Sequence, residues 1–143
     1  MASILVDSGI WYALCDSRDR TVERETVAEI YARIRVHTVV VPWPVLYETL
    51  GTRFARNRPA MERFEQEIKA SRTVLLDDAP YRDDALTHSL EWSLRRGRAL
   101  SLVDCVLRLL LDDVQTRIQY FVTFNQRDFV DVCTTRRIEL WSR

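Results

Sequence analysis

Short apolar runs that alternate with longer amphipathic stretches constrain the fold of this chain most strongly. Five runs have the length and composition of buried strands: 3–6, "HTVVVP" at 37–42, "TVLLDD" at 73–78, "QYFVTF" at 119–124 and "RRIELW" at 136–141. Strands that are apolar on both faces and separated by helices are typical of parallel sheets covered on both sides. The pattern therefore predicts a three-layer α/β fold with a parallel sheet of about five strands and helices on both faces.

Helical periodicity and helix-terminal residues mark the segments between these runs. Pro44 suits an early helical position, Thr21 is a possible N-cap, and Gly97 suits the end of a helix. Helices are expected at 9–15, 21–36, 44–56, 59–70, 80–96 and 101–114. The helices at 44–56 and 59–70 are expected to form a helical hairpin.

Composition narrows the class of protein. The chain has 143 residues, 47% of them hydrophobic, which suits a single domain over 1–143. Its 21 basic residues balance 21 acidic ones, so charge neither requires nor excludes a polyanionic partner. The three cysteines lie in apolar runs and favour reduced thiols, and no apolar stretch has the length of a membrane span. We expect a soluble cytoplasmic protein.

Acidic and polar side chains follow two of the predicted strands. Ligands of open parallel sheets bind beyond the carboxyl ends of the strands, where the strand order reverses. Asp7 and Ser8 follow the first strand, and Thr123, Asn125 and Asp128 end or follow the fourth. Each also has a structural interpretation, because Asp and Ser are common helix N-caps and Asn and Asp are common in turns.

Two further acids lie on predicted helices. Glu48 falls in a stripe of small residues, opposite the large residues expected to cover the apolar face: Leu46, Tyr47, Leu50 and Phe54. It is either a solvated glutamate or a carboxylate left accessible to a bulky ligand. In "SLVD", Asp104 takes the third helical position after a capping Ser101, with Arg108 as its expected ion-pair partner one turn later.

Taken together, the segments "VDSGIW", "VLYETL", "SLVDCVL" and "VTFNQRDF" resemble, in order and spacing, the PIN-domain family and within it the VapC-type toxin ribonucleases of toxin–antitoxin pairs. The resemblance implies a PIN-like fold and a hydrolase, a metal-dependent endoribonuclease that uses Mg²⁺ or Mn²⁺. The implied acidic quartet is Asp7, Glu48, Asp104 and Asp128, and the implied supporting polar groups are Ser8, Ser101, Thr123 and Asn125.

The chain departs from the family pattern in two places. Asn125 stands where many relatives have Asp, and the acid follows at Asp128; the segment "DSRDRTVE" lacks the His that many relatives carry. The alternative is therefore a catalytically impaired PIN-like module that binds RNA or protein. A haloacid-dehalogenase-type phosphatase is disfavoured because Gly9 stands where its second Asp belongs. A receiver domain is also disfavoured, because this chain has neither the paired acids after the first strand nor the Lys after the last strand that such a domain needs.

The expected chemistry follows from the ligand type. Hard divalent cations prefer carboxylate oxygens, and Mg²⁺ keeps several waters. One ion activates water, and a second at about 3.5–4 Å stabilises the leaving oxygen. We expect Asp7 and Asp104 to be the main ligands, Glu48 a ligand or water-orienting base, and Asp128 a second-site or outer ligand. Without metal, crowded carboxylates raise one another's pKa.

Partners also follow from the resemblance. The family works as a homodimer on RNA and is inhibited by a small antitoxin whose tail enters the acidic pocket. Candidate RNA contacts lie in two arginine clusters: Arg53, Arg56 and Arg58, and Arg95, Arg96 and Arg98. The alternative interpretation of each cluster is a charged surface that is solvated and binds no RNA. A candidate antitoxin surface comprises Trp11, Tyr12, Trp43 and Tyr47, although aromatic residues also build cores.

Overall fold

The computed structural model describes residues 2–141, except the side chains of Thr52 and Arg53. One parallel sheet runs through it in the order β3-β2-β1-β4-β5. The strands are β1 (Ser3–Val6), β2 (Thr38–Pro42), β3 (Thr73–Leu76), β4 (Ile118–Val122) and β5 (Glu139–Trp141). The predicted α/β fold with five parallel strands is confirmed.

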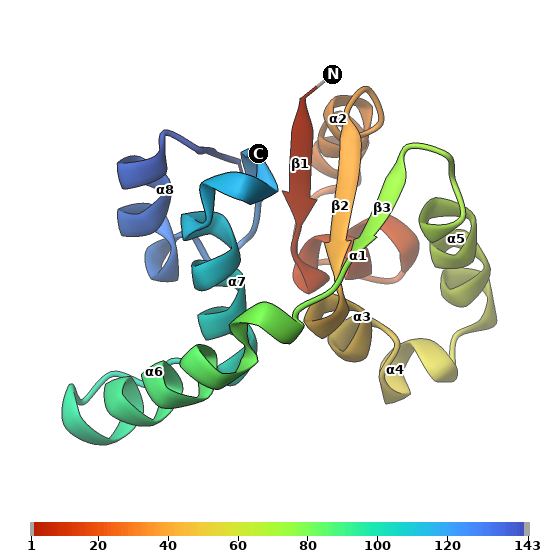
Figure 1. Cartoon of the computed structure of the whole chain (residues 1–143). Coiled ribbons are helices and arrows are strands. Elements are labelled where there is room, and N and C mark those ends of the chain that lie inside the picture. The colour runs from red at the N-terminus through yellow and green to blue at the C-terminus, as the bar shows by residue number, and fades with distance from the viewer. Residues whose placement is uncertain (1, 142–143) are drawn as a thin grey trace.

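Helices cover both faces of the sheet (Figure 1). The α-helices are α1 (Ser8–Cys15), α2 (Arg24–Ile34), α3 (Trp43–Thr49), α4 (Thr52–Ala55), α5 (Arg58–Ile68), α6 (Arg82–Arg95), α7 (Leu102–Asp112) and α8 (Val130–Arg136). Short 3₁₀ turns are η1 (Ala79–Tyr81), η2 (Val114–Thr116) and η3 (Gln126–Asp128). Helix α1 packs on α2, α3 and α5, whereas α7 packs on α6 and α8. Strand order reverses between β1 and β4, so right-handed crossovers place these two groups on opposite faces.

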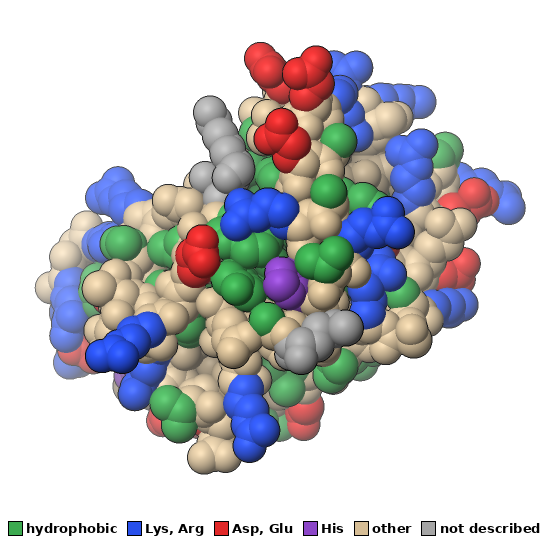
Figure 2. Space-filling model, turned by 90° about the horizontal axis from the view of Figure 1, so that it is seen from above, with side chains coloured by type: hydrophobic (Ala, Val, Ile, Leu, Met, Phe, Trp, Pro, Cys, Tyr) green, Lys and Arg blue, Asp and Glu red, His purple; other side chains and the backbone are tan. Residues whose placement is uncertain are grey.

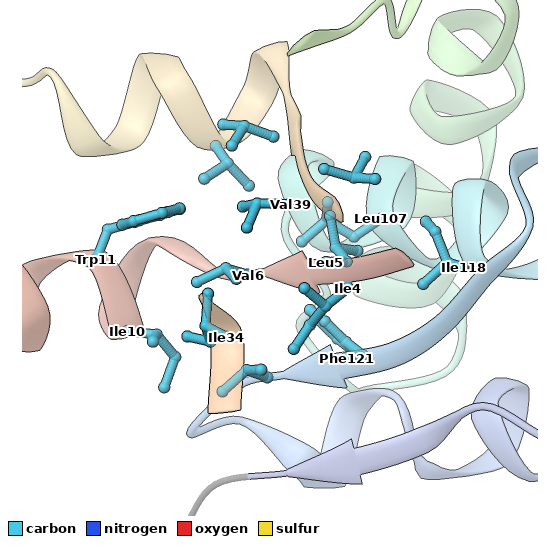
Figure 3. Packing of buried hydrophobic residues seen from close by; sticks show 14 of the residues in the cluster. Ile4, Leu5, Val6, Ile10, Trp11, Ile34, Val39, Leu107, Ile118 and Phe121 are labelled. Carbon is cyan, nitrogen blue, oxygen red and sulfur yellow. The ribbon is translucent and has the colours of Figure 1, made fainter. Parts of the chain in front are cut away.

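The core is built around the central strand. Ile4, Leu5 and Val6 of β1 are fully buried because helices cover both faces of the sheet (Figure 3). On one side, the rings of Trp11 and Phe64 meet edge to face with centroids 5.2 Å apart. Such burial of large side chains is the main favourable contribution to folding.

The prediction of one continuous helix at 44–56 is wrong, because the helix is interrupted near its middle. Helix α3 ends at Thr49, and the chain turns at Leu50 and Gly51, where an added Cβ on Gly51 would lie 3.3 Å from the carbonyl oxygen of Glu48. The buried residues also differ from the apolar face expected for one continuous helix. Leu46 and Phe54 are in the core as expected, but Leu50 is 40% exposed and Tyr47 is 73% exposed.

Some of the other helix ends follow the local sequence, and others do not. Ser101 caps α7 and Gly97 takes a positive φ of 65° after α6, both as predicted. Thr21 is not a cap: α2 begins at Arg24 after Glu23, and the Thr21 backbone N–H donates to Asp19. Helix α8 was not predicted from the sequence.

The surface carries mixed charge. Figure 2 views the molecule from the amino-terminal edge of the sheet, where basic, acidic and apolar side chains are interspersed. Within residues 2–141, no helix is long and apolar enough to cross a membrane. Cys15, Cys105 and Cys133 are buried free thiols.

Candidate active site

Asp7 lies where the strand order reverses. Its backbone N–H donates to the carbonyl oxygen of Val122, which joins the end of β1 to the end of β4. One carboxylate oxygen accepts from the backbone N–H of Ser8 at 2.8 Å, and the other accepts from the Thr123 hydroxyl at 2.8 Å. Asp7 is therefore both the N-cap of α1 and a residue of the predicted crevice. Burial raises its pKa, while these two hydrogen bonds act in the opposite direction.

Glu48 approaches the same point from α3. The Ser8 hydroxyl donates to one of its carboxylate oxygens at 3.1 Å, and the Tyr12 hydroxyl donates to its carbonyl oxygen. Partial burial raises the pKa of Glu48, and the charges of Asp7 and Asp104 raise it further. Although Glu48 is an exposed residue, its carboxylate is directed toward other acids and is not simply solvated.

Asp104 completes a group of three acids, called here the acidic triad: Asp7, Glu48 and Asp104. Its backbone N–H donates to the capping hydroxyl of Ser101 at 3.0 Å. Partial burial raises the pKa of Asp104 to about 6, and the negative charges of Asp7 and Asp128 contribute to the rise. The carboxylate therefore senses acids from two other segments of the chain.

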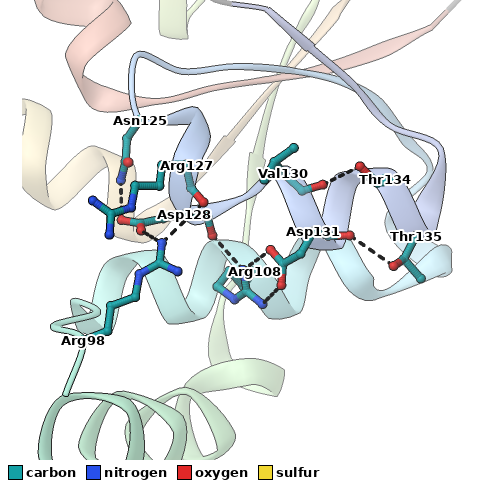
Figure 4. Close-up of polar contacts among 9 residues, drawn as sticks. All are labelled: Arg98, Arg108, Asn125, Arg127, Asp128, Val130, Asp131, Thr134 and Thr135. Carbon is teal, nitrogen blue, oxygen red and sulfur yellow. Dashed lines mark hydrogen bonds and ion pairs between the residues drawn. The ribbon is translucent and has the colours of Figure 1, made fainter. Parts of the chain in front are cut away.

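The expected pairing of Arg108 with Asp104 is wrong. The Arg108 guanidinium instead binds both carboxylate oxygens of Asp131 at 2.7 Å and donates to the Asp128 carbonyl oxygen at 2.7 Å (Figure 4). Helix α8 carries Asp131 and packs against α7, so the tertiary contact replaces the local one. This leaves Asp104 unneutralised by Arg108.

Asp128 differs electrostatically from the triad. Arg98 forms an ion pair with one of its carboxylate oxygens, and the Asn125 side-chain amide donates to the other at 2.8 Å (Figure 4). Partial burial acts to raise the pKa of Asp128, but the hydrogen bonds from Asn125 and Arg98 hold it below its usual value. Asn125 in turn donates its backbone N–H to the Thr123 hydroxyl. A polar chain thus connects Asp128 to Asp7.

The donor set suits a hard divalent cation in its chemistry but not in its present geometry. All four acids offer carboxylate oxygens, each of which accepts more than one hydrogen bond or ligand. Within residues 2–141, however, no three His, Cys, Asp or Glu side chains come close enough together to hold a metal ion. A cation shared by the quartet therefore requires these carboxylates to come closer together, with Glu48 now accepting from Ser8 and Asp128 paired with Arg98.

The candidate RNA arginines have different surroundings. Arg98 binds Asp128, Arg58 pairs with Glu62, and Arg96 lies near Glu91 and over the Trp92 ring. Arg56 and Arg95 are exposed. The Arg53 side chain lies outside the described residues.

The four candidate aromatic residues do not form one surface. Trp11 is fully buried in the core, whereas Trp43 and Tyr47 are 41% and 73% exposed. Tyr12 is half-buried and bonded to Glu48. This contact of Tyr12 with Glu48 was not predicted from the sequence, although Ser8 and Tyr12 are four residues apart and so share a face of α1.

Comparison with protein-family models and with curated proteins gives no match to this chain.

Proposed function

We propose that the chain is a divalent-metal-dependent endoribonuclease, the toxin of a type II toxin–antitoxin pair. One observation carries the proposal: Asp7, Glu48 and Asp104 come from three distant segments, and the charge of Asp7 helps to raise the pKa of both Glu48 and Asp104, while that of Asp104 helps to raise the pKa of Glu48. Among the described side chains, which do not include that of Arg53, no Lys or Arg forms an ion pair with any of the three. Crowded carboxylates without a basic partner favour a bound cation.

Each residue has a role in this proposal. Mg²⁺ or Mn²⁺, when bound, would supply an activated water and stabilise the leaving oxygen. Asp7 and Asp104 would hold the ion because both are fixed at helix N-termini by the hydrogen bonds described above. Glu48 would orient the water, with Ser8 setting the direction of its carboxylate. Thr123 would keep Asp7 in place.

The partners in this proposal are an RNA substrate and a small antitoxin in the cytoplasm. Exposed Arg56 and Arg95 are available for phosphate contacts, which would make RNA binding fall with rising salt. Trp43 and Tyr47 offer exposed rings, 6.0 Å apart, to an antitoxin segment beside Glu48.

The second candidate is a PIN-like module that binds RNA or protein without cleaving it. The ion pair between Arg98 and Asp128 favours this candidate because it neutralises the fourth acid. So does the lack, within residues 2–141, of a preformed group of three ligands.

The deciding experiment is cleavage of a structured RNA panel by purified protein with Mn²⁺, with Mg²⁺ and with excess chelator. We expect cleavage only with metal, and its loss in Asp7→Asn and Asp104→Asn. Asp112→Asn is the matched control, because Asp112 ends the same helix as Asp104 and pairs on the surface with Arg136. Cleavage that persists in chelator, or in Asp7→Asn, contradicts the proposal. RNA binding without cleavage supports the second candidate instead.

A further inference from the structure

The ion pair between Arg98 and Asp128 is held by a single guanidinium nitrogen. Nη2 of Arg98 donates to one carboxylate oxygen of Asp128 and, at 3.3 Å, to the carbonyl oxygen of Arg127 (Figure 4). Among the described atoms of the chain, Nε and Nη1 of Arg98 make no hydrogen bond. Two of the three guanidinium nitrogens are therefore available to an incoming anion.

The neighbouring arginine, Arg108, is held more firmly. Both of its terminal nitrogens bind the Asp131 carboxylate at 2.7 Å, and Nη1 also donates to the carbonyl oxygen of Asp128. The Arg108 side chain is 21% exposed, whereas that of Arg98 is 35% exposed. Bidentate contacts between arginine and a carboxylate are stronger and more specific in geometry than single ones. Arg98 is therefore the arginine of the two that can exchange its partner.

Arg98 lies where a polyanion can reach it. It follows Gly97, whose φ of 65° ends α6, and so belongs to the segment that joins α6 to α7. Arg95 and Arg96, at the end of α6, are exposed. The planar fork of a guanidinium group matches phosphate because it can donate two parallel hydrogen bonds to it. A phosphate group that binds at this end of α6 therefore competes with Asp128 for Arg98.

The carboxylate of Asp128 is close to the acidic triad, but Arg98 neutralises it. The charge of Asp128 contributes to the raised pKa of Asp104, and the polar chain described above joins Asp128 to Asp7. While Arg98 contacts Asp128, a cation bound to that carboxylate would lie beside a positive guanidinium, and the two positive charges repel each other. Removal of Arg98 from Asp128 therefore strengthens the attraction of the four acids for a divalent cation.

We propose that Arg98 is an exchangeable counter-ion of Asp128: a phosphate group of bound RNA takes the guanidinium, and the freed carboxylate joins the acidic triad in holding the divalent cation. The inference rests on the proposed function and adds to it a coupling between substrate and cation. Because such coupling is reciprocal, RNA and the cation should each bind more tightly when the other is present. The exchange also explains why the described side chains contain no preformed group of three ligands.

The first test is Mn²⁺ binding to the full chain without RNA, measured by titration calorimetry. We expect Arg98→Gln to bind Mn²⁺ several-fold more tightly than wild type, because the competing positive charge is gone. Arg98→Lys keeps that charge and should bind Mn²⁺ like wild type. Arg136→Gln is the matched control, because Arg136 also pairs with an aspartate, Asp112 at the far end of α7, and its loss should change the Mn²⁺ affinity little. Equal affinities of Arg98→Gln and wild type, or an equal rise in Arg136→Gln, overturn the inference.

The second test is binding of a labelled single-stranded RNA in excess chelator, measured by fluorescence anisotropy. Asp128→Asn should bind RNA several-fold more tightly than wild type because it releases Arg98, and most of this gain should disappear when Arg98→Gln is added. A gain of the same size with and without Arg98 overturns the inference. Circular dichroism checks that each variant is folded. Mn²⁺ and RNA binding that lack this coupling contradict the exchange of Arg98 and leave the proposed function standing, whereas no Mn²⁺ binding by wild type or by any variant contradicts both.

Discussion

Replacing Asp104 with Asn should stabilise the metal-free protein at neutral pH and have little effect in acid. The folded-state pKa of about 6 lies above the ordinary value of 3.8, so the folded chain keeps a proton that the unfolded chain has already released. Stability therefore falls as pH rises from about 4 through about 6 and stays lower above that window. Asn has no such titration, so the advantage of Asp104→Asn should grow across the same window.

The magnitude follows from the pKa difference. The interval from 3.8 to about 6 corresponds to an upper limit of ~3 kcal/mol. Asp104 is only half-buried, and solvent screening reduces this to about 1–2 kcal/mol. Asn also loses the favourable interaction of a carboxylate with the first turn of α7, worth ~0.3–1 kcal/mol. A net gain of about 1 kcal/mol remains, which raises the melting temperature by roughly 3 °C.

Urea unfolding of wild type and Asp104→Asn in chelator, at about pH 4 and about pH 8, measures this gain. Asp112→Asn provides the control, since its exposed pair with Arg136 should give no gain at either pH. Equal effects of Asp104→Asn at both pH values would refute the electrostatic reasoning. A variant less stable than wild type at about pH 8 would show that Asp104 serves only as a helix-terminal residue.

Two further predictions follow from buried groups. Thr123→Val should destabilise the fold by about 1–2 kcal/mol, because Thr123 is fully buried and its hydroxyl donates to Asp7, while Val nearly preserves the shape of Thr. Thermal melts of the wild type and the variant measure this loss of stability. Burial raises the pKa of the Cys15 thiol to about 12 and that of the Cys133 thiol to about 11. Both thiols should therefore react with a disulfide reagent at neutral pH only after unfolding. Rapid labelling of the native protein would contradict their burial.

Local patterns in the sequence determined the strands, their parallel arrangement and several helix ends. The apolar run before Asp7 identifies β1 because a central strand buries both faces, and this places Asp7 at the carboxyl edge of the sheet. Ser101 and Gly97 act on backbone groups within a few residues, so the local sequence alone is enough to predict the helix ends at these positions. These signals need no knowledge of distant parts of the chain.

Pairings between distant segments were decided only by the tertiary structure. Arg108 has an acid one turn earlier, yet it binds Asp131, which lies 23 residues away on α8. The contact of Ser8 with Glu48 spans 40 residues, and that of Arg98 with Asp128 spans 30.

Tyr47 is likewise 73% exposed although helical periodicity placed it on the apolar face, and the helix predicted there is interrupted after Thr49. Helical periodicity describes a residue's neighbours within one turn or two. The partner of a charge is instead set by which elements pack together, and one sequence read locally does not contain that information.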